Sequence, residues 1–420
     1  MGPGGVALLV GASLATRSAD TEYPFRQDSD FWYLTGFDHP GAVAVLRTDG
    51  GPPFTLFVQP REPSAETWTG YRPGVEGAKD DYGADEAFGI ESLSSELPGL
   101  IQQADRLYHV LGRNSKLDSQ ILEVLETLRQ QSRLGKAPPS QIMDPREITH
   151  EMRLHKEAKE LELMRRGAAI TAEAHGEAAR LAQDGRYEYE LEAVLNYTFR
   201  RRGGAGAAYG TIVGGGANAA TLHYIANNQP LRDGELVLID AGVEFEGYAS
   251  DVTRTYPVGG TFQGPGRAIY QAVLASQQAA LAACKPGATL NGIHNAALRT
   301  LVEAMIALEM IPGPVDDAIE EESYRPYYMH RTSHWLGLDV HDAGSYSQGG
   351  EPRVLEPGMV LTVEPGLYIA RDAEDSAVSD FRGIGVRIED DVVITSDGHE
   401  NLNSAIPKAP DEVEAWVRGG

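Results

Sequence analysis

Residues 231–242 read LRDGELVLIDAG, and residues 355–366 read LEPGMVLTVEPG. Both stretches run L-x-x-G, then an apolar run, then an acid with a glycine two positions later, so Asp240 and Glu364 hold equivalent places. A short apolar run between turn residues is typical of a buried strand. Burying a carboxylate at the end of such a strand is costly unless a cation or hydrogen bonds compensate its charge. The repeat therefore predicts a cation beside both acids.

The sequence before each copy of this repeat is also similar. Helical periodicity over 150–202 precedes the first copy, and two further helical patterns over 267–310 precede the second. We therefore predict an internal duplication, with pseudo-twofold symmetry, inside one C-terminal domain of residues 151–420. Residues 1–140 alternate strand-like and helical segments, which is typical of an α/β domain, and residues 141–150 are expected to link the two. The predicted fold class is mixed α/β.

Composition excludes several classes of protein. The 420 residues carry 36 Lys and Arg against 61 Asp and Glu, a formal charge of −25. This charge argues against nucleic acid or an anionic membrane as a partner, and no apolar run approaches membrane-spanning length. The single cysteine, Cys284, cannot form a disulfide within the chain and favours a reducing, cytoplasmic location.

Each copy of the repeat is followed by a second acid on a returning strand. After Asp240 the chain turns and continues as DVTRTYPV from Asp251, and after Glu364 it returns as GIGVRIEDDVVIT with Glu389. If the first turn is centred between residues 244 and 247, Asp240 and Asp251 lie directly opposite on neighbouring strands, with Cβ atoms about 5 Å apart. Four converging carboxylates raise one another's pKa unless cations are present, and two divalent ions match their charge.

Imidazole ligands are available nearby. Residues 329–342 read MHRTSHWLGLDVHD and contain His330, His334 and His341. Oxygen ligands with one imidazole suit Mn²⁺, Co²⁺ or Zn²⁺ better than Ca²⁺. A pair of metal ions sharing a water molecule is a hydrolytic centre, because the ions acidify the water and polarise a carbonyl group. The sequence thus predicts a dimetal hydrolase.

Several motifs resemble the pita-bread metallopeptidases, and most closely the aminopeptidase P family. They are LIDAG with DVTRTYPV, MHRTSHWLGLDVHD, LTVEPGLYI and GIGVRIEDDVVI, and upstream the stretches at 16–37 and 150–167. The resemblance covers nearly the whole chain. It implies an N-terminal α/β domain with a C-terminal pita-bread domain, and a manganese-type exopeptidase that releases the residue preceding a proline in the second position. It also implies a homodimer or homotetramer.

The resemblance further implies a role for each motif residue. The metal ligands would be Asp240, Asp251, His334, Glu364 and Glu389, with Asp251 and Glu389 bridging both ions. Glu364 would also be the general base for the bridging water, which attacks the scissile carbonyl. The other catalytic residues would be His223, His330, His341 and Arg387, and the substrate would contact Tyr209 and Trp68, the latter in a loop and supplied by its own or a neighbouring subunit.

Two alternatives stay open on these residues, and one residue departs from the family pattern. A prolidase has the same fold and metals but cleaves only Xaa-Pro dipeptides, and a non-catalytic pita-bread module would bind peptides or proteins. The departure is Arg331, at a position after His330 where a small residue is common. It leaves every ligand in place but changes the rim of the pocket.

Overall fold

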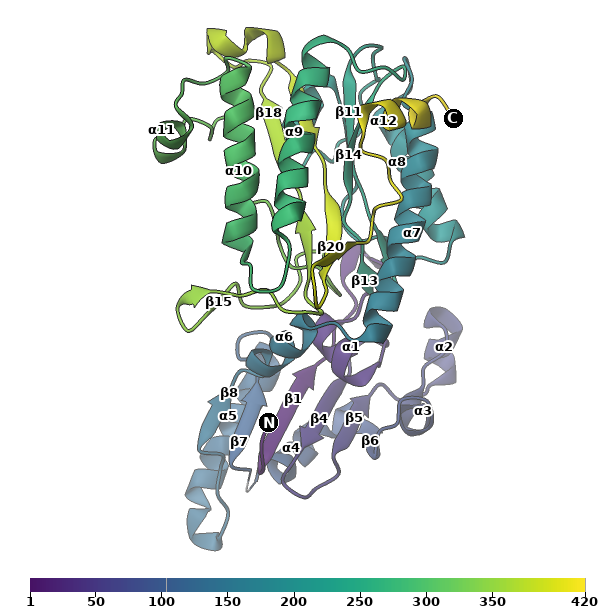
Figure 1. The fold of residues 1–420 in the computed structure, drawn as a ribbon. Helices are drawn as coiled ribbons and strands as arrows, with labels where there is room; N and C mark the ends of the chain where they lie inside the picture. The colour runs from purple at the N-terminus through teal and green to yellow at the C-terminus, as the bar shows by residue number, and fades with distance from the viewer. Residues whose placement is uncertain (103, 420) are drawn as a thin grey trace. The chain divides into compact units, whose positions relative to one another are not determined.

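The protein is described by a computed structural model that covers residues 1–102 and 104–419 (Figure 1). Its chain divides into two compact units, residues 1–151 and 152–420. No helix among the described residues combines the length and apolar character needed to cross a bilayer. Each unit has its own hydrophobic core.

Unit 1 is built on a mixed six-stranded sheet in the order β6-β5-β4-β1-β7-β8. The central strand β1 pairs antiparallel with β4 and parallel with β7. Its side chains alternate between two cores, with Leu8 on one face and Leu9 on the other, as a sheet covered on both faces requires. The strands are β1 (Gly5–Val10), β4 (Val43–Arg47), β5 (Phe54–Val58), β6 (Glu86–Gly89), β7 (Arg106–His109) and β8 (Gln141–Met143), with a separate ribbon of β2 (Thr16–Ser18) and β3 (Thr21–Glu22).

The helices of unit 1 connect these strands. They are α1 (Ser29–Thr35), α2 (Pro63–Thr69), α3 (Gly74–Asp80), α4 (Leu93–Ile101), α5 (Ser115–Gln130) and α6 (Arg146–Leu154), the last of which crosses the unit boundary. Residues 141–150, expected as a linker, instead form β8, which pairs in parallel with β7, and begin α6. Pairing with an existing strand satisfies their backbone groups.

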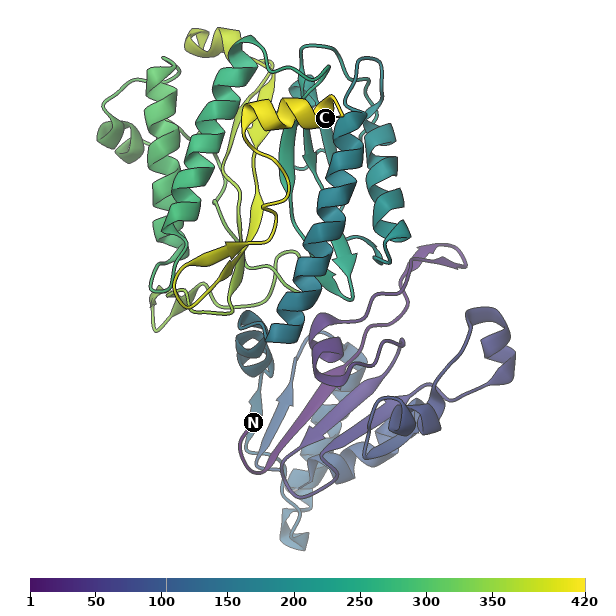
Figure 2. The same ribbon diagram turned by 45° about the vertical axis from the view of Figure 1, so that its right-hand side comes forward.

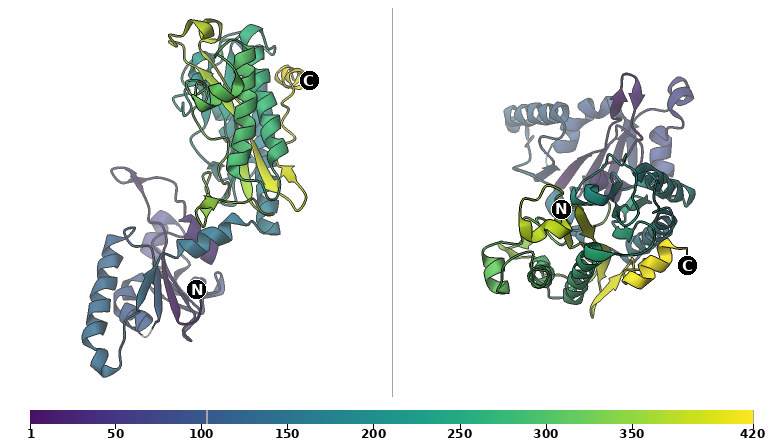
Figure 3. Two further views of the ribbon diagram at one scale, coloured as in Figure 1. Left: turned by 60° about the vertical axis from the view of Figure 1, so that its left-hand side comes forward. Right: turned by 90° about the horizontal axis from the view of Figure 1, so that it is seen from above.

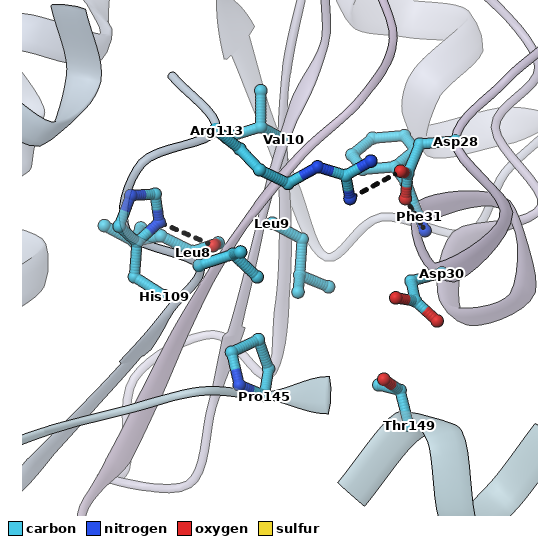
Figure 4. Close-up of a pocket in the computed structure, with 11 residues that line it drawn as sticks. Leu8, Leu9, Val10, Asp28, Asp30, Phe31, His109, Arg113, Pro145 and Thr149 are labelled. Atoms are coloured by element: carbon cyan, nitrogen blue, oxygen red, sulfur yellow. Dashed lines mark hydrogen bonds and ion pairs between the residues drawn. The ribbon is translucent and has the colours of Figure 1, made fainter. Parts of the chain in front are cut away.

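A small cavity of about 30 Å³ lies beside α1 in unit 1 (Figure 4). Asp28 on its wall caps α1 by accepting a hydrogen bond from the Phe31 amide at 2.9 Å, and it pairs with Arg113 at 2.8 Å. Across the cavity, the His109 ring lies 3.2 Å from the Leu8 carbonyl. A space of this size holds about one water molecule, so these polar groups serve the packing of unit 1.

Unit 2 contains two helix pairs, α7 (Ala158–Arg180) with α8 (Glu188–Arg201) and α9 (Gly264–Ala283) with α10 (Leu290–Ala307). Figures 1 and 2 show the pairs side by side, with strands packed against them, and Figure 3 shows α9 beside α10. The predicted helical run over 150–181 breaks between α6 and α7, because the Lys156 amide donates to the Gly358 carbonyl instead of continuing a helix.

The strands of unit 2 form the two related halves that the repeat predicts. In the first half β11 lies between β10 and β14, and a second small sheet has the order β13-β12-β9; in the second half β17 pairs with β20 and β18 with β19. The strands are β9 (Gly206–Ala207), β10 (Ile212–Gly215), β11 (Leu236–Asp240), β12 (Val243–Phe245), β13 (Tyr248–Ala249), β14 (Thr253–Pro257), β15 (Ser347–Gln348), β16 (Glu351–Pro352), β17 (Val360–Val363), β18 (Gly366–Ile369), β19 (Ile384–Arg387), β20 (Asp390–Ile394) and β21 (His399–Asn401), with short helices α11 (Val315–Glu320) and α12 (Pro410–Val417).

The predicted register of the first hairpin is wrong by two residues. Asp240 lies opposite Thr253, not Asp251. The reason is the turn, which is centred on Glu246 and Gly247, both with positive φ, so that Phe245 pairs with Tyr248. Because the error is an even number of residues, Asp251 keeps the face that was predicted and becomes a diagonal neighbour of Asp240.

Candidate metal centre

The repeated strands of unit 2 surround a cavity of about 270 Å³. Its openings and walls come from both halves of the duplication and from the histidine-rich segment that joins them. The sequence predicted that five metal ligands, three further histidines and Arg387 belong to one site, and all of these residues line this cavity. The lining residues are Leu222, His223, Asp240, Asp251, His330, Arg331, Ser333, His334, His341, Glu364, Arg387 and Glu389.

The four carboxylates lie where the strand ladders are interrupted. Asp240 is the last residue of β11, and Asp251 lies just before β14. Glu364 follows β17, and Glu389 stands between β19 and β20. Asp240, Asp251 and Glu389 are buried. Where the strand pairing stops, the backbone can turn and direct the acids into the cavity. The paired strands on either side hold the acids in position.

Arg387 is a buried guanidinium group that hydrogen-bonds to these acids. Its Nη2 donates to Asp240 Oδ2 at 2.7 Å, and its Nε donates to Thr253 Oγ1 at 3.0 Å. Thr253 in turn donates to Glu389 Oε2 at 2.7 Å. Arg387 therefore connects acids from the two halves of the repeat and fixes the direction of their carboxylate oxygens.

One arginine does not compensate three buried carboxylates and a partly buried one. Burial raises the pKa of Asp240 even though Arg387 opposes the shift. Burial also raises the pKa of Glu364 to about 7 and, with the charge of Asp251, raises that of Glu389 well above its ordinary value. The protein alone thus leaves negative charge in a desolvated site, and added cations would remove this cost.

The orientation of His334 fits a metal ligand. Its Nδ1 lies 2.9 Å from the Trp335 carbonyl, which only accepts, so Nδ1 donates to this carbonyl and Nε2 is directed at the acids. Nε2 lies 3.3 Å from Asp251 Oδ2 and 3.7 Å from Glu364 Oε1. Burial lowers the pKa of His334, but the hydrogen bond and charge of Asp251 outweigh it and raise the pKa to about 9.

Ligand atoms of Asp251, His334 and Glu389 lie within 4.8 Å of one another, close enough to hold one ion. Asp240 and Glu364 stand beside them on the same cavity. Carboxylate oxygens with one imidazole are a donor set for Mn²⁺, Co²⁺ or Zn²⁺. The raised pKa values of the acids, and the position of His334 Nε2 between Asp251 and Glu364, therefore fit the binding of divalent cations, which would replace the proton that Nε2 shares with Asp251.

The hydrogen bonds of His330 define its tautomer. Its Nδ1 lies 2.8 Å from the Arg331 carbonyl and therefore carries the proton. Its Nε2 accepts from the Tyr368 hydroxyl at 2.9 Å, and Arg387 donates to that hydroxyl at 3.0 Å. Burial lowers the pKa of His330 to about 4, so the ring is neutral at pH 7. With both nitrogens occupied, His330 presents its ring surface to the cavity.

His341 and His223 differ from His330 in their exposure. Both are exposed at the rim of the cavity. The His341 ring stands edge-on to His334 with centroids 4.4 Å apart, and partial burial of the imidazole together with the charge of His334 lowers the pKa of His341. Both rings are accessible from the cavity to a bound molecule.

Tyr209 and Trp68, the two expected substrate residues, lie in different surroundings. The Tyr209 hydroxyl donates to Asp240 Oδ1 at 2.6 Å, which orients this carboxylate. Trp68 belongs to unit 1, where it lies on helix α2 and not in the loop that was predicted. The sequence ETWTG follows Pro63, which is favourable in the first turn of a helix, and Gly70 ends it. Trp68 is 88% exposed.

Sequence reasoning missed the residues behind the acids. Asp391 accepts hydrogen bonds from the Asp251 amide at 3.1 Å and from Ser250 Oγ at 3.0 Å. Asp390 is fully buried and pairs with Arg254 at 2.6 Å. One sequence signal was available. Residues 389–391 are three consecutive acids beside an apolar run, and the stretch DVTRTYPV contains Arg254, which could pair with one of them.

Comparison with known proteins identifies the chain. Residues 162–396 match the metallopeptidase family M24, and residues 1–108 match the N-terminal domain of aminopeptidase P. The chain belongs to metallopeptidase family M24. Within the M24 family it is 45% identical to the Xaa-Pro aminopeptidase of Escherichia coli (strain K12), over 99% of this chain and 94% of that protein. It is 42% identical to the Xaa-Pro aminopeptidase of Haemophilus influenzae, over 99% and 93%.

Solved structures agree with this M24 assignment. The structure of Pseudomonas aeruginosa aminopeptidase PepP superposes with a TM-score of 0.96 at 45% identity, covering 100% of this chain and 95% of that one. Zinc-substituted E. coli aminopeptidase P in complex with product gives 0.95 at 45% identity, covering 99% and 94%. The predicted relationship to aminopeptidase P, the mixed α/β fold with a pita-bread domain and the metallo-aminopeptidase class are confirmed.

Proposed function

We propose that this chain is an Xaa-Pro aminopeptidase, which releases the N-terminal residue of peptides with proline in the second position. The observation that carries the proposal is the set of four carboxylates on one cavity with His334, whose Nε2 lies 3.3 Å from Asp251 and 3.7 Å from Glu364. The activity named for its relatives of 45% and 42% identity, which align along almost the whole chain, supports the substrate class. The retention of the complete ligand set argues against a non-catalytic module.

Five residues would hold two divalent cations. Asp240 would bind one ion and His334 the other, Asp251 and Glu389 would bridge them, and Glu364 would complete the set. We propose Mn²⁺ as the physiological metal, with Co²⁺ or Zn²⁺ as substitutes, because oxygen ligands outnumber the single imidazole. When bound, such ions lower the pKa of a shared water and polarise the scissile carbonyl group.

Glu364 is the general base in this proposal. It lines the cavity with one carboxylate oxygen 3.7 Å from His334 Nε2, so it lies beside the ligand set where it could accept a proton from water. It would take a proton from the attacking water and return it to the proline nitrogen as the peptide bond breaks. Arg387 and Tyr209 orient Asp240 through their hydrogen bonds and keep the acids in place during this transfer.

The three other histidines would position the substrate. His341 and His223 stand exposed on the cavity with ring N–H groups available for the scissile carbonyl and its neighbours. His330 is held neutral between the Arg331 carbonyl and Tyr368, so its ring offers an apolar wall on which a proline ring can pack.

The test is hydrolysis of matched peptides by metal-depleted protein before and after addition of Mn²⁺, Co²⁺ or Zn²⁺. We expect release of alanine from Ala-Pro-Ala only with metal, and little cleavage of Ala-Ala-Ala. Cleavage confined to the dipeptide Ala-Pro would assign a prolidase instead. No hydrolysis of any of these peptides at full metal occupancy would refute the proposal.

Two further properties belong to the proposal. The protein would be a homodimer or homotetramer in which a neighbouring subunit contacts the exposed Trp68, and light scattering of the wild type and Trp68→Ala would test this. The single buried cysteine, Cys284, favours the cytoplasm as the location.

A further inference from the structure

A second cavity of about 260 Å³ adjoins the metal centre. Arg331 and Ser333 line both cavities, so the two spaces share a wall. The other walls of the second cavity come from the first turn of α10, with Asn291 and His294, and from the segment after β16, with Arg353. All of these residues belong to unit 2.

The charge of the second cavity is opposite to that of the metal centre. Arg331 and Arg353 line it, and none of the described residues on its walls is acidic. Burial lowers the pKa of His294 to about 4, with a further contribution from the charge of Arg331, so His294 is neutral at pH 7. Arg331 and Arg353 are the charged residues that line this cavity among those the structure describes, in a chain with a formal charge of −25.

Arg331 is held in place but keeps donors for a ligand. Its Nη2 donates to Asn291 Oδ1, which fixes the guanidinium group at the shared wall. The side chain is otherwise exposed, and a guanidinium group has five N–H donors in a planar fork. That fork matches the two oxygens of a carboxylate.

Ser333 adds a polar group without an internal partner. Its hydroxyl oxygen is buried on the wall of both cavities and has no hydrogen-bond partner within the described residues. A buried hydroxyl without a partner is unfavourable. A ligand or water reaching from one cavity into the other would satisfy it.

We propose that the second cavity is a subsite for a substrate carboxylate, with Arg331 as the residue that sets this preference. The inference rests on the proposed peptidase function. A peptide bound at the metal centre would place its negatively charged part beside Arg331, away from the site acids. The carboxylate is either the C-terminus of a short peptide or an acidic side chain close to the scissile bond.

Two pairs of peptides distinguish these sources. Ala-Pro-Ala and its C-terminal amide test the terminal carboxylate, and the amides of Ala-Pro-Glu and Ala-Pro-Gln test a side-chain carboxylate. In the Mn²⁺-loaded wild type we expect kcat/KM to be about tenfold higher for the charged member of at least one pair, the size expected for a charge-assisted hydrogen bond. Inhibition by Pro-Ala and by Pro-Ala-amide measures the same preference without turnover.

Three variants assign the preference to Arg331. Arg331→Gln should bring the ratio close to one, and Arg331→Lys should keep part of the ratio because the charge remains without the fork. Arg325→Gln is the matched control, since Arg325 is exposed, pairs with Glu322 and lines neither cavity. It should keep the wild-type ratio.

The outcomes separate the two proposals. Equal kcat/KM within both pairs, or a preference that survives Arg331→Gln, overturns the subsite while the peptidase function stands. Failure of the metal-loaded wild type to cleave any of the four peptides overturns the peptidase function and the subsite with it. A preference that collapses in Arg331→Gln but not in Arg325→Gln supports the subsite.

Discussion

Replacing Asp390 with asparagine should destabilise the protein far more than the loss of one charge at the surface. Asp390 is completely buried and accepts hydrogen bonds from Arg254, from Gln277 at 2.7 Å and from Asn401 at 2.7 Å. Lys408 also donates to it. Arg254 is also fully buried, and its Nη2 lies 2.6 Å from Asp390 Oδ1. Asp390→Asn keeps the shape but leaves the charge of Arg254 without its buried counter-ion.

The size of the effect follows from this burial. Removing one partner of a buried ion pair costs about 3–5 kcal/mol, because the remaining charge stays desolvated. The neighbouring cations hold the pKa of Asp390 well below its ordinary value, although burial acts in the other direction. A lowered folded-state pKa means that the stabilisation is fully present above the unfolded-state pKa of about 4 and is lost only as pH falls below it. The difference between wild type and variant should therefore be constant from pH 5 to 8.

Urea unfolding followed by circular dichroism measures this difference, with the shift of the midpoint for unit 2 as the readout. Asp316→Asn is the matched control, because Asp316 pairs with Arg299 at 2.6 Å but is 80% exposed. Exposed pairs contribute about 0–1 kcal/mol. If Asp390→Asn destabilises no more than Asp316→Asn, the buried network does not stabilise the fold as we argue.

Other predictions concern the metal centre and acid stability. Asp251→Asn should abolish both metal binding and turnover, as metal analysis and peptide assays would show; full activity would exclude a bridging role. His341→Ala should keep its metal but lose about 10²-fold or more in kcat, and loss of metal would contradict a purely catalytic role. His175 is fully buried, and burial lowers its pKa to about 4. A depressed histidine pKa stabilises the fold above the unfolded value of 6.5, so acidification to pH 4.5 should cost the wild type about 2.5 kcal/mol more than His175→Gln in urea unfolding.

The sequence was sufficient to predict the elements that a repeat and a hydrophobic period define. The apolar runs that end at Asp240 and Glu364 form β11 and β17, and both acids reach one cavity. Asp251 and Glu389 were found because each lies next to a returning strand, β14 and β20, whose residues alternate. An acid at the end of an apolar strand could be assigned to the site from sequence, because the alternation of side chains along a strand fixes the face on which each one lies.

What sequence could not predict depended on tertiary contacts. The turn at Glu246 and Gly247 shifted the register by two residues, because positive φ at a non-glycine residue has no strong sequence signal. Helix α2 around Trp68 was taken for a loop between two prolines. The second cavity beside Arg331 depends on α10 and β16 meeting near the histidine segment, which no local pattern shows.

The acid run at 389–391 explains how one strand serves both stability and chemistry. Alternate residues of an extended chain share a face. Glu389 and Asp391 therefore lie on the face toward the metal centre, and Asp390 lies on the opposite face. Glu389 faces the cavity, and Asp391 holds the Asp251 amide. Arg254, which pairs with Asp390, also donates to the Glu389 carbonyl at 2.6 Å. The buried ion pair therefore anchors the backbone that carries a metal ligand, so the stability lost in Asp390→Asn should be accompanied by weaker metal binding.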